Sequence, residues 1–78
     1  MEVVLVTRQG CHLCDQALAL LRELGVDPSL ADVDADDELF RLYDWRVPVV
    51  LADKAVVAEG RIVKSQLEKA LNRSGRDP

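Results

Sequence analysis

The two cysteines of the chain, Cys11 and Cys14, stand three residues apart in the segment VTRQGCHLCDQALALLREL. An apolar run ends just before them, and a helical pattern of apolar residues begins at Cys14. Cys11 is therefore expected at a helix start, where unpaired N–H groups and the helix dipole favour a thiolate. Cys14 begins the apolar stripe and is expected to be sheltered. Such a pair can attack a disulfide and then resolve the mixed disulfide within one molecule.

Other uses of the thiols stay open from the residues alone. A structural disulfide would close a short loop and add little stability. A metal could bind Cys11, His12 and Cys14, although the sequence offers no second ligand pair that completes a tetrahedral site. Covalent haem attachment needs a histidine where Asp15 stands. The cysteines could also be apolar residues of a binding module, but their place between a strand and a helix favours thiol–disulfide exchange.

Length and composition limit the classes of protein to which this chain can belong. The 78 residues suit a single domain, expected to span residues 1–78, and the net charge of −4 argues against a nucleic-acid partner. No apolar run approaches the ~20 residues of a membrane span, and no signal peptide is recognised, so we expect a cytoplasmic protein without a membrane partner. A cluster of acids is interpreted as helix caps and solvated loop residues, with metal binding as the alternative: Asp27, Asp32, Asp34, Asp36, Asp37 and Glu38.

The elements that must position the cysteines alternate between strands and helices. The β-branched run VVLV at 3–6 predicts a buried strand, and residues 12 to about 24 predict an amphipathic helix closed by Gly25. SLADVD alternates as a strand does, and ADDELFRLYDW predicts a second helix with an apolar stripe of Leu39, Leu42 and Tyr43.

The C-terminal half predicts two further strands and a helix. VPVVL and AVVAE are short β-rich runs joined by a hairpin at ADK. A capping box from Ser65 to Glu68 opens the last helix, whose apolar face includes Val63 and Leu67, and residues 72–78 predict a frayed or capping tail. The predicted order is β-α-β-α-β-β-α, with a parallel first unit and an antiparallel last pair, in a four-stranded mixed sheet flanked by helices.

The chain resembles the glutaredoxin-like branch of the thioredoxin superfamily over nearly its whole length, above all the small bacterial proteins with GCHLC. The resemblance rests on VTRQGCHLCDQALALL, ADVDADDEL and YDWRVPVVL. It implies a thioredoxin-like fold in which Cys11 attacks and Cys14 resolves. It also implies that Pro48 follows a cis peptide bond and faces the dithiol, and that the backbone of Val47 pairs with a bound peptide or with glutathione.

Three arginines are candidates for contacts with substrate. Arg8 stands where many glutaredoxins have a lysine before the nucleophile, and a cation there would favour the thiolate or meet a substrate carboxylate. A solvated loop arginine is the alternative. Arg41 or Arg46 could act in the same way from the other side of the cleft.

Two ring side chains near the dithiol are also candidates. His12, when protonated, would lower the pKa of Cys11, or it is an exposed spacer. Trp45, three residues before Pro48, is expected either in the core or along the substrate groove.

The sequence departs from the glutaredoxin pattern where glutathione would bind. His12-Leu13 replaces the usual Pro-Tyr, Ala58-Glu59 replaces Gly-Gly, and the region 60–62 replaces an aspartate that holds the glutathione amino end. We expect a monomeric thiol–disulfide oxidoreductase that needs no metal or cofactor. Its partners would be protein disulfides or, less well, glutathione, with a thioredoxin-type reductase as a candidate electron donor. The alternative is a non-catalytic module that binds a peptide or a metal.

Overall fold

A computed structural model describes residues 1–75, with the side chains of residues 1–71. Its elements follow the predicted order: β1 (Val3–Thr7), α1 (His12–Glu23), β2 (Ser29–Asp32), α2 (Asp37–Tyr43), β3 (Val49–Ala52), β4 (Ala55–Glu59) and α3 (Lys64–Gly75). The strands form one sheet in the order β2-β1-β3-β4. β1 and β2 are parallel, whereas β1 with β3 and β3 with β4 are antiparallel. The predicted four-stranded mixed sheet is confirmed.

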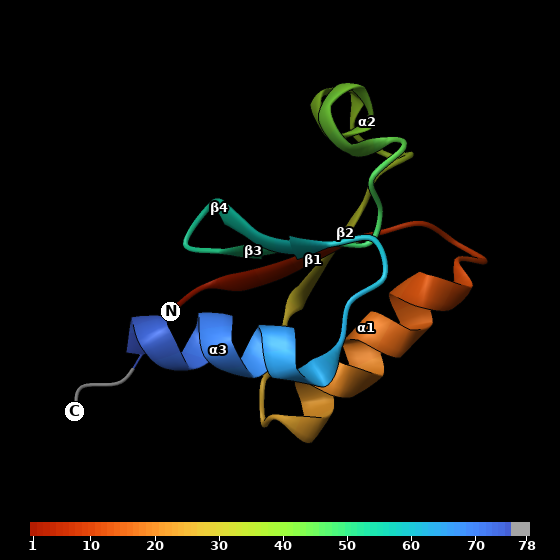
Figure 1. The fold of residues 1–78 in the computed structure, drawn as a ribbon. Coiled ribbons are helices and arrows are strands. Elements are labelled where there is room, and N and C mark those ends of the chain that lie inside the picture. The colour runs from red at the N-terminus through yellow and green to blue at the C-terminus, as the bar shows by residue number, and fades with distance from the viewer. Residues whose placement is uncertain (76–78) are drawn as a thin grey trace.

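Helices cover both faces of this sheet, α1 and α3 on one side and α2 on the other (Figure 1). Strand geometry explains the two layers, because successive side chains of a strand point to opposite faces. Leu5 pairs with Val50, and Val6 pairs with Val49. The first pair joins the cluster beneath α1 and α3, which comprises Leu5, Ala17, Leu21, Val50, Ala58 and Leu67. The second pair joins a smaller cluster with Val33, against which Leu39 and Tyr43 of α2 pack.

α1 forms because its apolar side chains recur on one side of the helix, where Cys14, Ala17 and Leu21 are buried. The helix ends in a Schellman motif. The Gly25 N–H donates to the Arg22 carbonyl at 3.0 Å, and the Val26 N–H donates to the Leu21 carbonyl at 2.9 Å. Gly25 has a φ of +80°, so the predicted closure by glycine is confirmed.

α2 is attached to the sheet more lightly than the other helices. Asp36 caps it, since its Oδ1 accepts the Leu39 N–H at 3.0 Å. None of its seven residues is buried. Leu42, predicted to lie on the inner stripe, is 41% exposed, because only Leu39 and Tyr43 reach the cluster on this face of the sheet.

α3 begins at Lys64, so Ser65 lies inside the helix and the predicted start at a capping box is wrong. The first turn forms earlier because the Val63 carbonyl accepts the N–H groups of Gln66 and Leu67, at 3.1 and 3.3 Å. Val63 itself precedes the helix and is 53% exposed, contrary to its predicted place on the apolar face.

The predicted tail at 72–78 is helical as far as Gly75, and its last three residues lie outside the described part of the chain. Across residues 1–75, the helices are too short or too polar to span a membrane.

Candidate dithiol site

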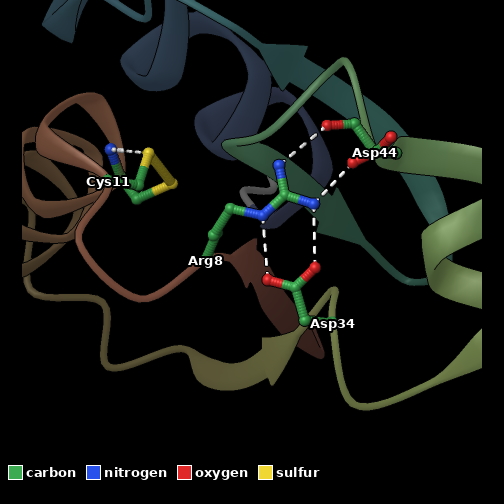
Figure 2. The surroundings of a disulfide bond; sticks show 5 residues. Arg8, Cys11, Asp34 and Asp44 are labelled. Carbon is green, nitrogen blue, oxygen red and sulfur yellow. Dashed lines mark hydrogen bonds and ion pairs between the residues drawn. A yellow bond between two sulfur atoms is a disulfide. The ribbon is translucent and has the colours of Figure 1, made fainter.

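Cys11 and Cys14 lie where β1 passes into α1, and they form a disulfide in the structure with their Cα atoms 5.2 Å apart (Figure 2). Cys11 is the N-cap of α1, and its Sγ accepts the backbone N–H of Cys14 at 3.1 Å. Cys14 is 1% exposed, whereas Cys11 is half-buried. One sulfur therefore lies at the helix start within reach of solvent, and the other lies beneath it.

A tight turn sets Cys11 at the start of the helix. The Cys11 N–H donates to the Arg8 carbonyl at 3.2 Å, and Gly10 has a φ of +80°. A positive φ at the third residue is the geometry of a type II turn, which glycine adopts without strain. This turn lets the chain leave β1 and enter α1 within a few residues.

The segment before β3 returns the chain to the same end of the sheet. Val49 pairs with Val6, so Val47 and Pro48 lie at the end from which the cysteine turn leaves. The Val47–Pro48 peptide bond is cis, and the Pro48 carbonyl accepts the Gly60 N–H at 2.9 Å. Within residues 1–75, the N–H and the carbonyl of Val47 make no hydrogen bond.

Arg8 is held between two carboxylates and is not the solvated loop residue that was the alternative. Its Nε and one terminal nitrogen donate to the two carboxylate oxygens of Asp34, both at 2.9 Å. The same terminal nitrogen also donates to the Asp44 carboxylate, and the other terminal nitrogen donates to the Asp44 backbone carbonyl at 3.3 Å. Figure 2 shows the guanidinium directed at these carboxylates and away from the disulfide.

The ion pairs around Arg8 shift its pKa and that of Asp34. Hydrogen bonds from Arg8 to Asp34 and Asp44 raise the pKa of the guanidinium above its ordinary value. The same hydrogen bonds lower the pKa of Asp34. The arginine charge is thus compensated by two carboxylates, and a substrate carboxylate would have to displace one of them.

Sequence reasoning missed Asp34 and Asp44 as partners of Arg8. A signal for Asp34 was present, because parallel strands end at the same edge of a sheet. Thr7 of β1 pairs with Asp32 of β2, so Arg8 and Asp34 follow their strands at neighbouring positions. No comparable local pattern indicates Asp44, whose place depends on how α2 sits over the sheet.

The other predicted arginines are also paired. Arg46 forms an ion pair with Glu59 at 2.6 Å and lies 5.1 Å from the centre of the Tyr43 ring. This pairing raises the pKa of Arg46 and lowers that of Glu59. Arg41 pairs with Glu38 one helical turn away on α2.

The two predicted ring side chains both face solvent. His12 is the first residue of α1 and is exposed. Trp45 is 93% exposed, so its predicted alternative of core packing is wrong. α2 ends at Tyr43, whose carbonyl accepts the Arg46 N–H at 2.9 Å, and Trp45 lies in this turn outside the packed layers.

The acidic cluster predicted from the sequence does not assemble a metal site in the described part of the chain. Within residues 1–75, no three His, Cys, Asp or Glu side chains are grouped so that they could hold an ion. The acids of the cluster have other roles there, since Asp36 caps α2 and Asp34 pairs with Arg8.

The architecture and the C-x-x-C disulfide at a helix start together define a redox module of thioredoxin-like fold. The family model described as "Glutaredoxin-like domain (DUF836)" matches residues 2–72. The chain therefore belongs to this glutaredoxin-like family, as its motifs indicated.

Solved structures agree with this assignment. The structural-genomics target XcR50 from X. campestris is 28% identical, with a TM-score of 0.78 over 91% of this chain and 96% of that one. A mutant of the thioredoxin-like protein BC3987 is 26% identical, with a TM-score of 0.74 over 91% of this chain and 100% of that one. A glutaredoxin (grx-1) from Archaeoglobus fulgidus, 21% identical with a TM-score of 0.68 over 90% and 85%, supports the fold alone. The search of curated proteins found no match.

Proposed function

We propose that this protein is a thiol–disulfide oxidoreductase in which Cys11 is the nucleophile and Cys14 the resolving thiol. The observation that carries the proposal is the hydrogen bond from the Cys14 N–H to the Cys11 Sγ at the N-cap of α1. This donor and the helix dipole stabilise a thiolate at Cys11. Cys14 is 1% exposed and can be reached by the neighbouring sulfur more readily than by a substrate.

The exchange proceeds in two balanced steps. The Cys11 thiolate attacks one sulfur of a substrate disulfide, forms a mixed disulfide and releases the other substrate sulfur as a thiolate. Cys14, on losing its proton, attacks the Cys11 sulfur and releases the second substrate thiol. The dithiol loses two electrons, the substrate gains them, and the protein ends with the Cys11–Cys14 disulfide.

The segment before β3 supports a binding role for Val47 and Pro48. The Val47 N–H and carbonyl have no hydrogen-bond partner among the described residues, and they lie at the dithiol end of the sheet. An extended substrate segment can pair with such backbone groups whatever its side chains. Arg8 and His12 were candidate contacts too, and of these His12 is the more available, since Arg8 is engaged with two carboxylates.

Trapping of the intermediate tests the assignment of the two roles. The reduced variants Cys14→Ser and Cys11→Ser would be mixed with bis(hydroxyethyl) disulfide and weighed by intact mass spectrometry. We expect a stable mixed-disulfide adduct on Cys14→Ser and little on Cys11→Ser, because Cys14 is buried. Equal adducts on both variants, or adducts on Cys11→Ser alone, would contradict the assignment.

Glutathione is expected to be a poor substrate. Its glutamyl end needs close backbone approach and a carboxylate partner, whereas Ala58 and Glu59 carry side chains and Glu59 is paired with Arg46. A lost charge-assisted hydrogen bond costs about 1.5–3 kcal/mol, which is roughly tenfold to a hundredfold in affinity. We therefore expect poor turnover of the protein in a glutathione-coupled disulfide assay, and reduction by a thioredoxin system should be no worse. Turnover equal to that of ordinary dithiol glutaredoxins would show that other groups hold the glutamyl end.

A further inference from the structure

Three of the seven exposed large apolar side chains of the described residues lie on α2 or just after it. They are Phe40, Leu42 and Trp45, with 45%, 41% and 93% of their surface exposed. Phe40 and Leu42 are two positions apart on the helix and face different sides, so we name only Phe40 and Trp45 the α2 surface. α2 itself has no buried residue, so this helix presents apolar side chains toward solvent. Exposed aromatic side chains, tryptophan above all, are the residues that most often anchor protein interfaces.

Arg8 connects this surface to the dithiol. Its backbone carbonyl accepts the Cys11 N–H, and its guanidinium donates to the backbone carbonyl of Asp44, the neighbour of Trp45. The same guanidinium lies 6.0 Å from the centre of the Phe40 ring. Figure 2 shows Arg8 between the cysteine turn and Asp44. A single polypeptide could therefore contact the α2 surface while its disulfide lies at Cys11.

The charge around the α2 surface is negative. Residues 34–46, together with Arg8 and Glu59, carry six carboxylates and three guanidinium groups, which leaves an excess of three negative charges. Each of the three arginines is already paired, Arg8 with two acids at once. The two acids of this set that form no ion pair within the described residues are Asp36 and Asp37, at the start of α2. Clustered acids alone do not define a site, but here most of them lie on the same helix as the exposed apolar side chains or on the segments that flank it.

We propose that the α2 surface docks the substrate of the dithiol, and that this substrate is a polypeptide with an apolar side chain and Lys or Arg residues near its disulfide. The inference rests on the proposed exchange activity and names its substrate class. Complementary charge would raise the rate of encounter, and Trp45 would supply the apolar anchor. A small anionic disulfide gains neither contact.

The test uses single-turnover exchange between the reduced protein and short peptides whose cysteine is linked to thionitrobenzoate. Three peptides share a leucine beside the cysteine and differ only in flanking residues, which are lysine, glutamine or glutamate. Each rate constant is divided by that for dithiothreitol under the same conditions, because flanking charge also alters the intrinsic reactivity of a disulfide. The mixed disulfide of mercaptoethanol and thionitrobenzoate serves as the small reference substrate.

We expect the lysine peptide to react about tenfold faster than the glutamate peptide at low salt, with the ratio falling toward one at about 0.5 M salt. Trp45→Ala should lower the ratio of the lysine-peptide rate to the small-substrate rate by about tenfold. Asp37→Lys should lower the same ratio at low salt only.

Matched variants elsewhere control for general effects. Val56→Ala removes another exposed apolar side chain, and Glu68→Lys makes the same charge change on α3, across the sheet from α2. Both should keep the wild-type ratio within about twofold, and circular dichroism checks that every variant is folded.

The test distinguishes a failure of the docking inference from a failure of the proposed function. Loss of exchange with the small substrate in the wild-type protein would contradict the proposed function itself. Normal exchange with the small substrate, but equal rates for the three peptides or an unchanged ratio in Trp45→Ala, would overturn the docking inference and leave the proposed function standing.

Discussion

Arg8 joins three segments that lie far apart in the sequence: the turn before α1, the loop after β2, and the end of α2. It contacts Asp34 with two parallel hydrogen bonds, the arrangement that gives an arginine–carboxylate pair its directionality. Its contacts with Asp44 anchor the residue that precedes Trp45. We therefore regard Arg8 as a residue that positions the segment leading to Pro48 relative to the cysteines.

Asp34→Asn should lower the melting temperature, and the effect should depend on pH in a defined direction. Arg8 lowers the pKa of Asp34 in the folded state. The contribution of the pair is therefore complete above about pH 4, the ordinary range of an aspartate, and is lost as the pH falls through the lowered folded-state value. Thermal denaturation of both proteins from neutral pH to about pH 2 should show melting temperatures that converge at the acid end.

Asp27→Asn is the matched control for this prediction. Asp27 is exposed and makes no ion pair within the described residues, so its replacement should change the melting temperature little at any pH. A difference between wild type and Asp34→Asn that stays constant down to the lowest pH would show that the carboxylate charge is not what stabilises the fold.

Some single residues could be placed from the sequence, and others could not. Cys11 and Cys14 could be placed because they stand at a strand–helix junction, whereas the prediction for Pro48 came from the resemblance of its segment to that of a known family. Trp45 could not be placed, since apolar residues near a helix end are buried or exposed according to what covers them, and here nothing in the described chain does. The pairing of Arg8 with Asp44 likewise depends on the position of α2 and not on sequence spacing.

At the scale of elements, periodic patterns in the sequence predicted which helices and strands exist better than they predicted where these elements begin and end. α1 was recognisable from its buried face and from Gly25, whose closing hydrogen bonds are present. α3 was misplaced at its start because SQLE matches a capping box, while the backbone already turns at Val63. The hairpin between β3 and β4 was expected from the short polar ADK, but its backbone conformation was not.

Lys54→Gly should raise the free energy of unfolding by about 1 kcal/mol. The two-residue turn of the hairpin holds Asp53 and Lys54 at φ values of 51° and 75°. A left-handed backbone costs an L-residue such as lysine roughly 1–2 kcal/mol, and glycine adopts it without that cost. Urea denaturation of the two proteins would measure the difference.

Asp53→Gly is the informative comparison, because Asp53 has a second role. Its Oδ1 accepts the Glu2 N–H at 2.9 Å, which ties the N-terminal segment to the turn. Glycine would relieve the backbone there but remove this hydrogen bond, so the net gain should be smaller than for Lys54→Gly. A loss of stability in Lys54→Gly would mean that the left-handed turn is not a source of strain in this hairpin.

At the scale of the whole molecule, burial is distributed unequally between the two faces of the sheet. The larger cluster lies beneath α1 and α3 and includes the fully buried Leu21 and Leu67. The smaller cluster beneath α2 is made mainly of valines. Most of the stability should therefore come from the α1–α3 side, while α2 is held by Leu39, Tyr43 and the arginine ion pairs.

Leu67→Ala and Leu42→Ala should separate these two layers. Leu67 is completely buried, and its truncation should cost about 2–5 kcal/mol of unfolding free energy. Leu42 is 41% exposed on α2, so the same truncation should cost less than about 0.5 kcal/mol. Equal costs in urea denaturation would contradict the proposed imbalance between the layers.

The pH dependence of cysteine alkylation decides whether the fold makes Cys11 the reactive thiol. Reduced protein would be pulsed with iodoacetamide from about pH 5 to pH 9, and the label at each cysteine quantified by peptide mass spectrometry, with urea-unfolded protein as the reference. We predict that Cys11 is labelled first, with an apparent pKa below the ~8.5 of a free cysteine, and that Cys14 is labelled slowly. Equal labelling of both cysteines in the folded protein, with one ordinary pKa near ~8.5, would contradict the assignment of Cys11 as an activated nucleophile.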